Sequence, residues 1–277
     1  MVQPRDLTAA EKSRPYSRYY LEPMAPPDPT LIAKASFDRP IDPAKALLPE
    51  HINDLLDPGY LEVETGWCIL PNGAGYASLN VPMPGITVDM IEWWYGWHGL
   101  EDLRYMIWYP PSHYGARVSE ADRAKILDPS RPPRLKFQGI THYVLEDVGE
   151  GGPSDITISF MTPEQLGFDM ARFRAPNVGT VVGGQIWQKL AGAPADVPSK
   201  PLVMVHFVRE IPGGVEYRTR FWMGYAFVDG RPKCMLPPGV RAPAEAPKGA
   251  LRHNIEEYSN LRVLLPKLYK EYGGRYA

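Results

Sequence analysis

The amino-acid sequence predicts an α+β fold, in which an antiparallel sheet is wrapped on one long C-terminal helix. Two observations predict it. Strand-like runs with tight turns fill the middle of the chain, and apolar side chains recur at helical spacing over residues 250–272. A helix lying across a curved sheet leaves a cavity between them, where an aromatic or apolar ligand is expected.

Composition argues against several classes of protein. The chain has 277 residues, a formal net charge of −2 and no basic block, which argues against a nucleic-acid partner. No apolar run reaches the roughly 18 residues that span a bilayer, and the polar N-terminus does not resemble a secretory signal. Only Cys68 and Cys234 are present, too few for a disulfide framework, so we expect a reducing, cytoplasmic location.

We expect two parts along the chain, residues 1–58 and residues 59–277. The first part is a Pro-rich arm followed by a short helix over residues 43–56, which Asp57-Pro58-Gly59 ends. Two interpretations of residues 1–40 stay open: an arm that wraps the core or a partner subunit, and a disordered tail.

The second part begins with strands over residues 60–70 and 76–81, joined by an Asn72-Gly73 turn. A helix over residues 87–97 follows, with Thr87 as its N-cap. Residues 103–109 read as a strand and residues 119–127 as a surface helix. Four further strands are expected over residues 137–147, 155–161, 202–210 and 215–228, with a Gly213-Gly214 hairpin between the last two. Residues 182–185 read as a bend in a strand.

The C-terminal helix carries the most informative residues. His253 and Glu257 are four apart, so they share one helix face, and this face continues into an apolar stripe formed by Leu261, Leu264 and Leu268. A buried imidazole and carboxylate must be paired or bind a ligand, and the pair suits a divalent metal such as zinc. The alternative is a core histidine with a protein partner beside a half-exposed glutamate.

Three more candidates precede this helix. His113 follows Pro110-Pro111 and is expected in a rigid loop, as a ligand or as a solvated side chain. His142 and Glu146 lie four apart on a strand and face one side, which is either the cavity side or an exposed polar face.

His206 lies in a strand that is apolar on both faces, as a core histidine or a substrate contact. Six tryptophans are candidates for an aromatic pocket or for the plain core: Trp93, Trp94, Trp97, Trp108, Trp187 and Trp222. Neither a G-x-S-x-G elbow nor a GxGxxG motif or P-loop is present, so no nucleotide cofactor is indicated.

Together these segments resemble the 2,4-diacetylphloroglucinol hydrolase and phloretin hydrolase family. The resemblance covers most of the chain after about residue 45. It is carried by five segments: Glu92-Trp93-Trp94-Tyr95-Gly96-Trp97-His98, the run from Arg104 to His113, Glu146, Arg220-Phe221-Trp222-Met223-Gly224, and His253-x-x-x-Glu257.

The resemblance implies a helix-grip domain of the START-like type, preceded by a smaller N-terminal helical part that helps to form a homodimer. It implies one zinc ion per chain in the cavity, and by position the ligands are His113, Glu146, His253 and Glu257, with His142 as the nearest competitor. Tyr105 and His206 correspond to substrate contacts. Ala116 stands where a polar contact is expected, which leaves the identity of the natural substrate open.

The reaction implied by the resemblance is hydrolysis of the carbon–carbon bond between a phloroglucinol ring and its acyl group. The ring takes up a proton at the acyl-bearing carbon, and attack of water on the acyl carbonyl permits a retro-Claisen cleavage. His206 and Tyr105 are expected to hold hydroxyls and relay the ring proton. Glu146 or Glu257 is expected to be a weakly held ligand that doubles as a base.

Two alternatives remain at this point. One is a non-catalytic carrier of an aromatic polyketide, and the other is a related metal-dependent polyketide hydrolase or cyclase. Iron, manganese and cobalt suit the same ligand set as zinc.

Overall fold

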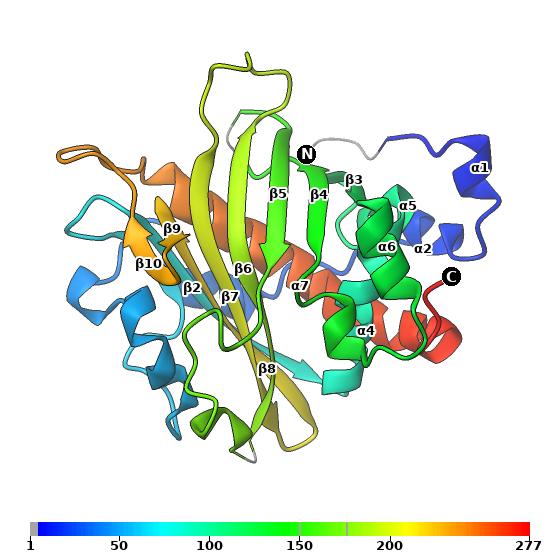
Figure 1. Cartoon of the computed structure of the whole chain (residues 1–277), viewed down its shortest axis with the longest axis horizontal. Coiled ribbons are helices and arrows are strands. Elements are labelled where there is room, and N and C mark those ends of the chain that lie inside the picture. The colour runs from blue at the N-terminus through cyan, green and yellow to red at the C-terminus, as the bar shows by residue number, and fades with distance from the viewer. Residues whose placement is uncertain (1–4, 150, 176) are drawn as a thin grey trace.

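The computed structural model describes residues 5–149, 151–175 and 177–277. Its centre is an eight-stranded antiparallel sheet in the order β1-β2-β8-β7-β6-β5-β4-β3. The helix α7 (Glu245–Tyr272) crosses one face of this sheet from end to end (Figure 1). This arrangement confirms the α+β fold, in which a sheet wraps on the last long helix.

The sheet consists of β1 (Gly66–Ile69), β2 (Gly75–Pro84), β3 (His113–Val118), β4 (Thr141–Glu146), β5 (Ser154–Phe160), β6 (Val178–Leu190), β7 (Lys200–Ile211) and β8 (Gly214–Met223). A separate hairpin pairs β9 (Tyr225–Val228) with β10 (Arg231–Cys234). The other α-helices are α1 (Ala9–Lys12), α2 (Ser17–Leu21), α3 (Pro29–Ala35), α4 (Val88–Trp97), α5 (Asp102–Met106) and α6 (Glu120–Leu127). The 3-10 helices are η1 (Pro43–Lys45), η2 (Pro49–Leu56), η3 (His98–Leu100), η4 (Pro133–Lys136) and η5 (Arg172–Arg174).

The long helix α7 buries the face that the sequence predicts. Leu261, Leu264 and Leu268 lie in the main apolar core, on the same side as His253 and Glu257. The helix begins at Glu245, five residues before the expected start, and includes Pro266. The helix therefore makes more than four turns before it reaches the apolar stripe at Leu261.

Residues 182–185 lie within the strand β6, as expected, but its extent over Val178–Leu190 was not predicted. A Cβ atom on Gly184 would lie 2.0 Å from the carbonyl oxygen of Ser159 on β5. A Cβ atom on Gly183 would lie 2.6 Å from the carbonyl oxygen of Met204 on β7. The glycines therefore allow both neighbouring strands to approach β6 closely.

Two further predictions are wrong in local structure. Residues 103–109 are not a strand, because Asp102–Met106 form α5, where the Arg104 guanidinium stacks on Trp97 and donates to the Tyr276 carbonyl. An apolar run cannot by itself distinguish a buried helix from a strand. His113 is not in a loop but opens the edge strand β3.

The described part of the N-terminal arm packs on α7. The backbone N–H of Ala25 donates to Asn260 (3.0 Å), and Asp28 pairs with Arg262 (2.8 Å). Tyr19 and Leu31 are buried in the main core. Of the two interpretations of residues 1–40, packing on the core is therefore the one observed for residues 5–40, while the division at residue 58 stays a prediction. Among the described residues, no helix combines the length and apolarity needed to cross a membrane.

Candidate active site

A cavity lies between α7 and the sheet face that α7 covers. Its wall includes apolar residues of β5 to β8, aromatic residues of α4 and α5, and one face of α7. The lining residues that carry polar or ionisable side chains are Tyr95, His98, Tyr105, Trp108, Glu146, Gln188, His206, His253, Asn254 and Glu257. The predicted candidates His206, His253, Glu146 and Tyr105 thus share one cavity.

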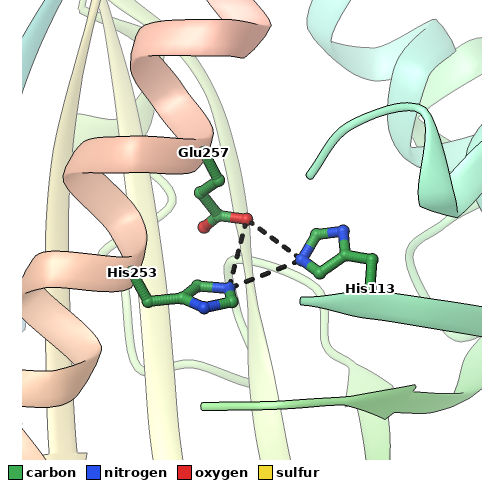
Figure 2. A group of neighbouring side chains, drawn as sticks. All are labelled: His113, His253 and Glu257. Carbon is green, nitrogen blue, oxygen red and sulfur yellow. Dashed lines mark hydrogen bonds and ion pairs between the residues drawn. The ribbon is translucent and has the colours of Figure 1, made fainter. Parts of the chain in front are cut away.

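Three side chains point toward one another at the wall of this cavity, which His253 and Glu257 line (Figure 2). His113 comes from the start of β3, and His253 and Glu257 come from successive turns of α7. The His113 Nε2 atom lies 3.4 Å from His253 Nε2 and 3.6 Å from Glu257 Oε2. The His253 Nε2 atom lies 3.7 Å from Glu257 Oε2.

These distances fit a shared metal ion. A tetrahedral zinc with bonds of about 2.1 Å separates its ligand atoms by about 3.4 Å, close to the three distances found here. Two imidazole nitrogens and a carboxylate oxygen are also the donor types that zinc prefers. The buried group of His113, His253 and Glu257 can therefore bind a metal ion.

Both imidazoles are held in the orientation that ligation requires. The Nδ1 atom of His113 lies 3.2 Å from the carbonyl oxygen of Tyr105, so this nitrogen donates and Nε2 keeps its lone pair. The Tyr105 ring stacks on His113 with centroids 4.0 Å apart. The His253 ring also hydrogen-bonds the main chain of Asp147. A free lone pair on Nε2 of His113 follows, and this atom lies 3.4 Å from Nε2 of His253.

Glu146 lies beside the group of three. It pairs in register with His113 across β3 and β4, and its Oε2 atom is 3.6 Å from His113 Nε2. The Tyr105 hydroxyl donates a hydrogen bond to the same carboxylate. Three of the four predicted ligands thus form one compact group, and the fourth lies next to it on the neighbouring strand.

The electrostatics of this group are unfavourable without a cation. Burial raises the pKa of Glu146 to about 7. Burial and the nearby charge of Glu146 raise the pKa of Glu257 well above its usual value. Burial lowers the pKa of His253 to about 4 and that of His113 well below its ordinary value. A bound cation would favour ionised carboxylates and neutral imidazoles together.

His206 faces the cavity from β7, as expected for an inward-facing residue. Its Nδ1 atom lies 2.9 Å from the Thr219 hydroxyl, and the Tyr258 hydroxyl lies 3.1 Å from each ring nitrogen. Burial lowers its pKa to about 3, so the ring is neutral near pH 7. His206 therefore bonds a tyrosine, as the alternative of a core histidine predicts, and it also lines the cavity. The alternative of a substrate contact stays a prediction.

His142 does not join the group. It is fully buried, so the interpretation as an exposed polar face is wrong, and the ring packs against Phe160 and His98 at centroid distances of 4.9 and 5.2 Å. Neither ring nitrogen has a hydrogen-bond partner among the described residues. The strand β4 therefore turns His142 and Glu146 to the same face but into different surroundings.

Sequence reasoning missed several lining residues. Tyr95 and His98 belong to the Trp-rich helix end, and Asn254 directly follows His253. The 3.6-residue period of α4 was a usable signal, because Ile91, Tyr95 and His98 share one face. Of the six tryptophans, Trp108 lines the cavity and Trp187 is 39% exposed. The others are buried core residues: Trp93, Trp94, Trp97 and Trp222.

Comparison with known proteins gives a consistent result. The family profile described as the DAPG hydrolase PhiG domain matches residues 47–270. Phloretin hydrolase of Eubacterium ramulus is 33% identical over 266 residues, which cover 94% of this chain and 91% of that protein. The 2,4-diacetylphloroglucinol hydrolase of a Pseudomonas species is 29% identical over 283 residues, 96% of this chain and 90% of that protein. The same-named enzyme of Pseudomonas protegens is 29% identical, with 96% and 87% covered. The chain therefore belongs to the DAPG hydrolase family.

Proposed function

We propose that this hydrolase cleaves the carbon–carbon bond between a phloroglucinol ring and its acyl group, in substrates of the phloretin or 2,4-diacetylphloroglucinol type. The bond from ring to carbonyl carbon breaks, the hydroxyl of water ends on the acyl carbon as a carboxylic acid, and the ring carbon gains a proton. The step is redox-neutral and requires no nucleotide cofactor. Family membership and the two relatives named as hydrolases of these ketones support the substrate class.

The single observation that carries the mechanism is the buried group of His113, His253 and Glu257, two of which line the cavity. We propose that it binds one zinc ion per chain and that Glu146, 3.6 Å from His113 Nε2, is the fourth ligand. When bound, the metal would supply positive charge that polarises an acyl or phenolic oxygen and lowers the pKa of water. Glu146 or Glu257 is the carboxylate we expect to be held weakly and to accept a proton from water.

Two other side chains would assist the reaction, His206 at the substrate ring and Tyr105 at Glu146. His206 is neutral and has its orientation set by Thr219 and Tyr258, so it can accept a proton from a phenolic hydroxyl and return it to the ring. Burial and the charge of Glu146 raise the pKa of Tyr105 well above its usual value, so Tyr105 remains a hydrogen-bond donor. It would hold Glu146 in place beside the reacting acyl group.

The experiment is release of phloroglucinol from phloretin by the purified protein, followed by chromatography. It is performed before metal removal, after chelation and after zinc is added back. Release that zinc restores is the expected outcome. His253→Ala should abolish both metal content and release, whereas His51→Ala, at an exposed histidine of η2, should change neither.

Other outcomes point elsewhere. One metal ion per chain without release from either ketone type would favour a related polyketide hydrolase or cyclase. Tight binding of phloretin without metal and without release would favour a carrier. His206→Ala with zinc intact and activity unchanged would remove His206 from the mechanism.

A homodimer and a cytoplasmic location are parts of the proposal that rest on the family resemblance and on composition. Exposed apolar side chains in the arm, Leu21 and Ile32, support a further contact surface. Light scattering of the purified chain would measure the oligomeric state.

A further inference from the structure

The two ends of the cavity differ in chemistry and exposure. One end is lined by Tyr95, His98 and His206, each at most 3% exposed. The other end is lined by apolar side chains of the sheet, by Gln188 beyond them, and by Ala246 and Ala250 of α7, two alanines that are half-buried. The cavity encloses about 830 Å³, part of it open solvent. It is therefore closed and polar at one end, and apolar and open at the other.

The helix α7 shows how long the apolar end is. Its cavity-lining positions are Ala246, Ala250, His253, Asn254 and Glu257, which share one helix face. At about 1.5 Å per residue, Ala250 lies roughly 10 Å and Ala246 roughly 16 Å along the axis from Glu257. Alanine, the smallest side chain that favours a helix, thus occupies the cavity-facing positions of the two turns next to His253.

The sheet opposite these turns is continuous and apolar. Strand register places Ile158, Ile186, Leu202 and Met223 side by side in one row across β5 to β8. All four line the cavity, and Gln188 lines it one row further along β6. His206 lies on β7 four residues from Leu202, in the direction opposite to Gln188. At about 3.3 Å per residue, it is about 13 Å along the strand from the apolar row.

Substrate chemistry then assigns the two ends. A trihydroxylated ring needs hydrogen-bond partners, which the buried end supplies through Tyr95, His98 and His206. The reacting carbonyl must reach the group of His113, His253 and Glu257 in the middle. The remaining acyl chain can then extend only along the apolar row, toward Ala250 and Ala246.

We propose that this apolar end is a subsite for a long acyl chain that finishes in an aromatic ring, and that Ala250 and Ala246 determine whether such a chain is accepted. The proposal rests on the proposed function and narrows its substrate class to arylalkanoyl phloroglucinols such as phloretin. An acetyl group would leave the subsite empty.

The experiment compares phloretin with monoacetylphloroglucinol on the metal-loaded protein and on Ala250→Phe and Ala246→Phe. We expect the ratio of kcat/KM for phloretin to kcat/KM for the acetyl ketone to fall at least tenfold in Ala250→Phe and less in Ala246→Phe. Glu245→Phe is the matched control, because it adds the same bulk at an exposed neighbouring position of α7 and should change neither substrate. Retained acetyl cleavage also reports that each variant is folded.

A second measurement needs no variant. The tail fragment 3-(4-hydroxyphenyl)propanoate should inhibit acetyl-ketone cleavage by the unmodified protein, and Ala250→Phe should weaken this inhibition at least tenfold. Phloroglucinol, the ring fragment, should inhibit the unmodified protein and Ala250→Phe equally.

The outcomes separate the subsite from the proposed function. Cleavage of the acetyl ketone but not of phloretin, no inhibition by the tail fragment, or an equal loss on both substrates in Ala250→Phe would overturn the subsite and leave the hydrolase intact. Cleavage of neither ketone by the metal-loaded protein would overturn both.

Discussion

On the face of the sheet turned away from α7, Glu64 lies between Arg218 and Arg220, at 2.5 and 2.6 Å. On the face that α7 covers, Glu257 and Glu146 lie beside two histidines, and no lysine or arginine is among the described residues that line the cavity. Both faces bury carboxylates. On the face turned away from α7, arginines of the chain supply the countercharge. On the face that α7 covers, a bound cation would have to supply it.

The pKa values follow this difference. Burial alone would raise the pKa of Glu64, but the charge of Arg220 and hydrogen bonds from Arg218 lower it to about 2. Burial raises the pKa of Glu146 to about 7, and the Tyr105 hydrogen bond does not offset it. A buried carboxylate that has a countercharge in the chain supports the fold. A carboxylate that lies in a cavity without a countercharge is typical of a ligand site.

The largest expected effect is on the face of the sheet that carries Glu64, Arg218 and Arg220. Glu64→Gln leaves two buried arginines without countercharge and should lower the free energy of unfolding by about 3–5 kcal/mol. Urea denaturation measures it. Glu62→Gln is the control, because Glu62 forms an exposed ion pair with Lys45. Loss of this pair should lower the free energy of unfolding by less than about 1 kcal/mol. Equal effects of the two substitutions would contradict the comparison.

On the cavity face the same substitution should act through the metal. Glu257→Gln should leave the free energy of unfolding of the metal-free chain unchanged within about 1 kcal/mol, since it removes a buried carboxylate that lacks a countercharge. Zinc at 100 to 1,000 times the dissociation constant should stabilise the original chain by about 3–4 kcal/mol and the variant far less. A variant that is strongly destabilised without metal would show that Glu257 is a structural residue.

A pH titration should distinguish Glu64 from other acidic groups. Its pKa is about 2 in the folded chain and about 4.5 as the reference value, so its stabilising contribution is complete above pH 4.5 and is lost as pH falls toward 2. The difference in unfolding free energy between the original chain and Glu64→Gln should therefore shrink between these pH values. A pH-independent difference would contradict the pairing.

The smallest effect concerns His142, whose ring nitrogens have no hydrogen-bond partner among the described residues. His142→Leu should be neutral or should stabilise by about 1 kcal/mol, because it removes a buried, unsatisfied polar group. Metal content by elemental analysis should remain one ion per chain. Loss of the metal would make His142 a ligand after all.

The sequence by itself determined the elements whose periodicity is local. The spacing of His253, Glu257, Leu261 and Leu264 sufficed to place all four on the buried face of α7. The alternation along β4 likewise sufficed to turn His142 and Glu146 to one side. Such predictions hold because each depends only on the geometry of one element.

Only the tertiary structure decided which of these side chains meet. His113 reaches α7 because β3 pairs with β4 and places it opposite Glu146, a long-range register that no short segment encodes. Residues 102–106 form a helix in which Arg104 stacks on Trp97 and donates a hydrogen bond to the Tyr276 carbonyl. The space beside Ala250 exists because an apolar row of four strands faces it. A cavity is the volume that separate elements leave between them, so the spacing of residues within one element cannot define it.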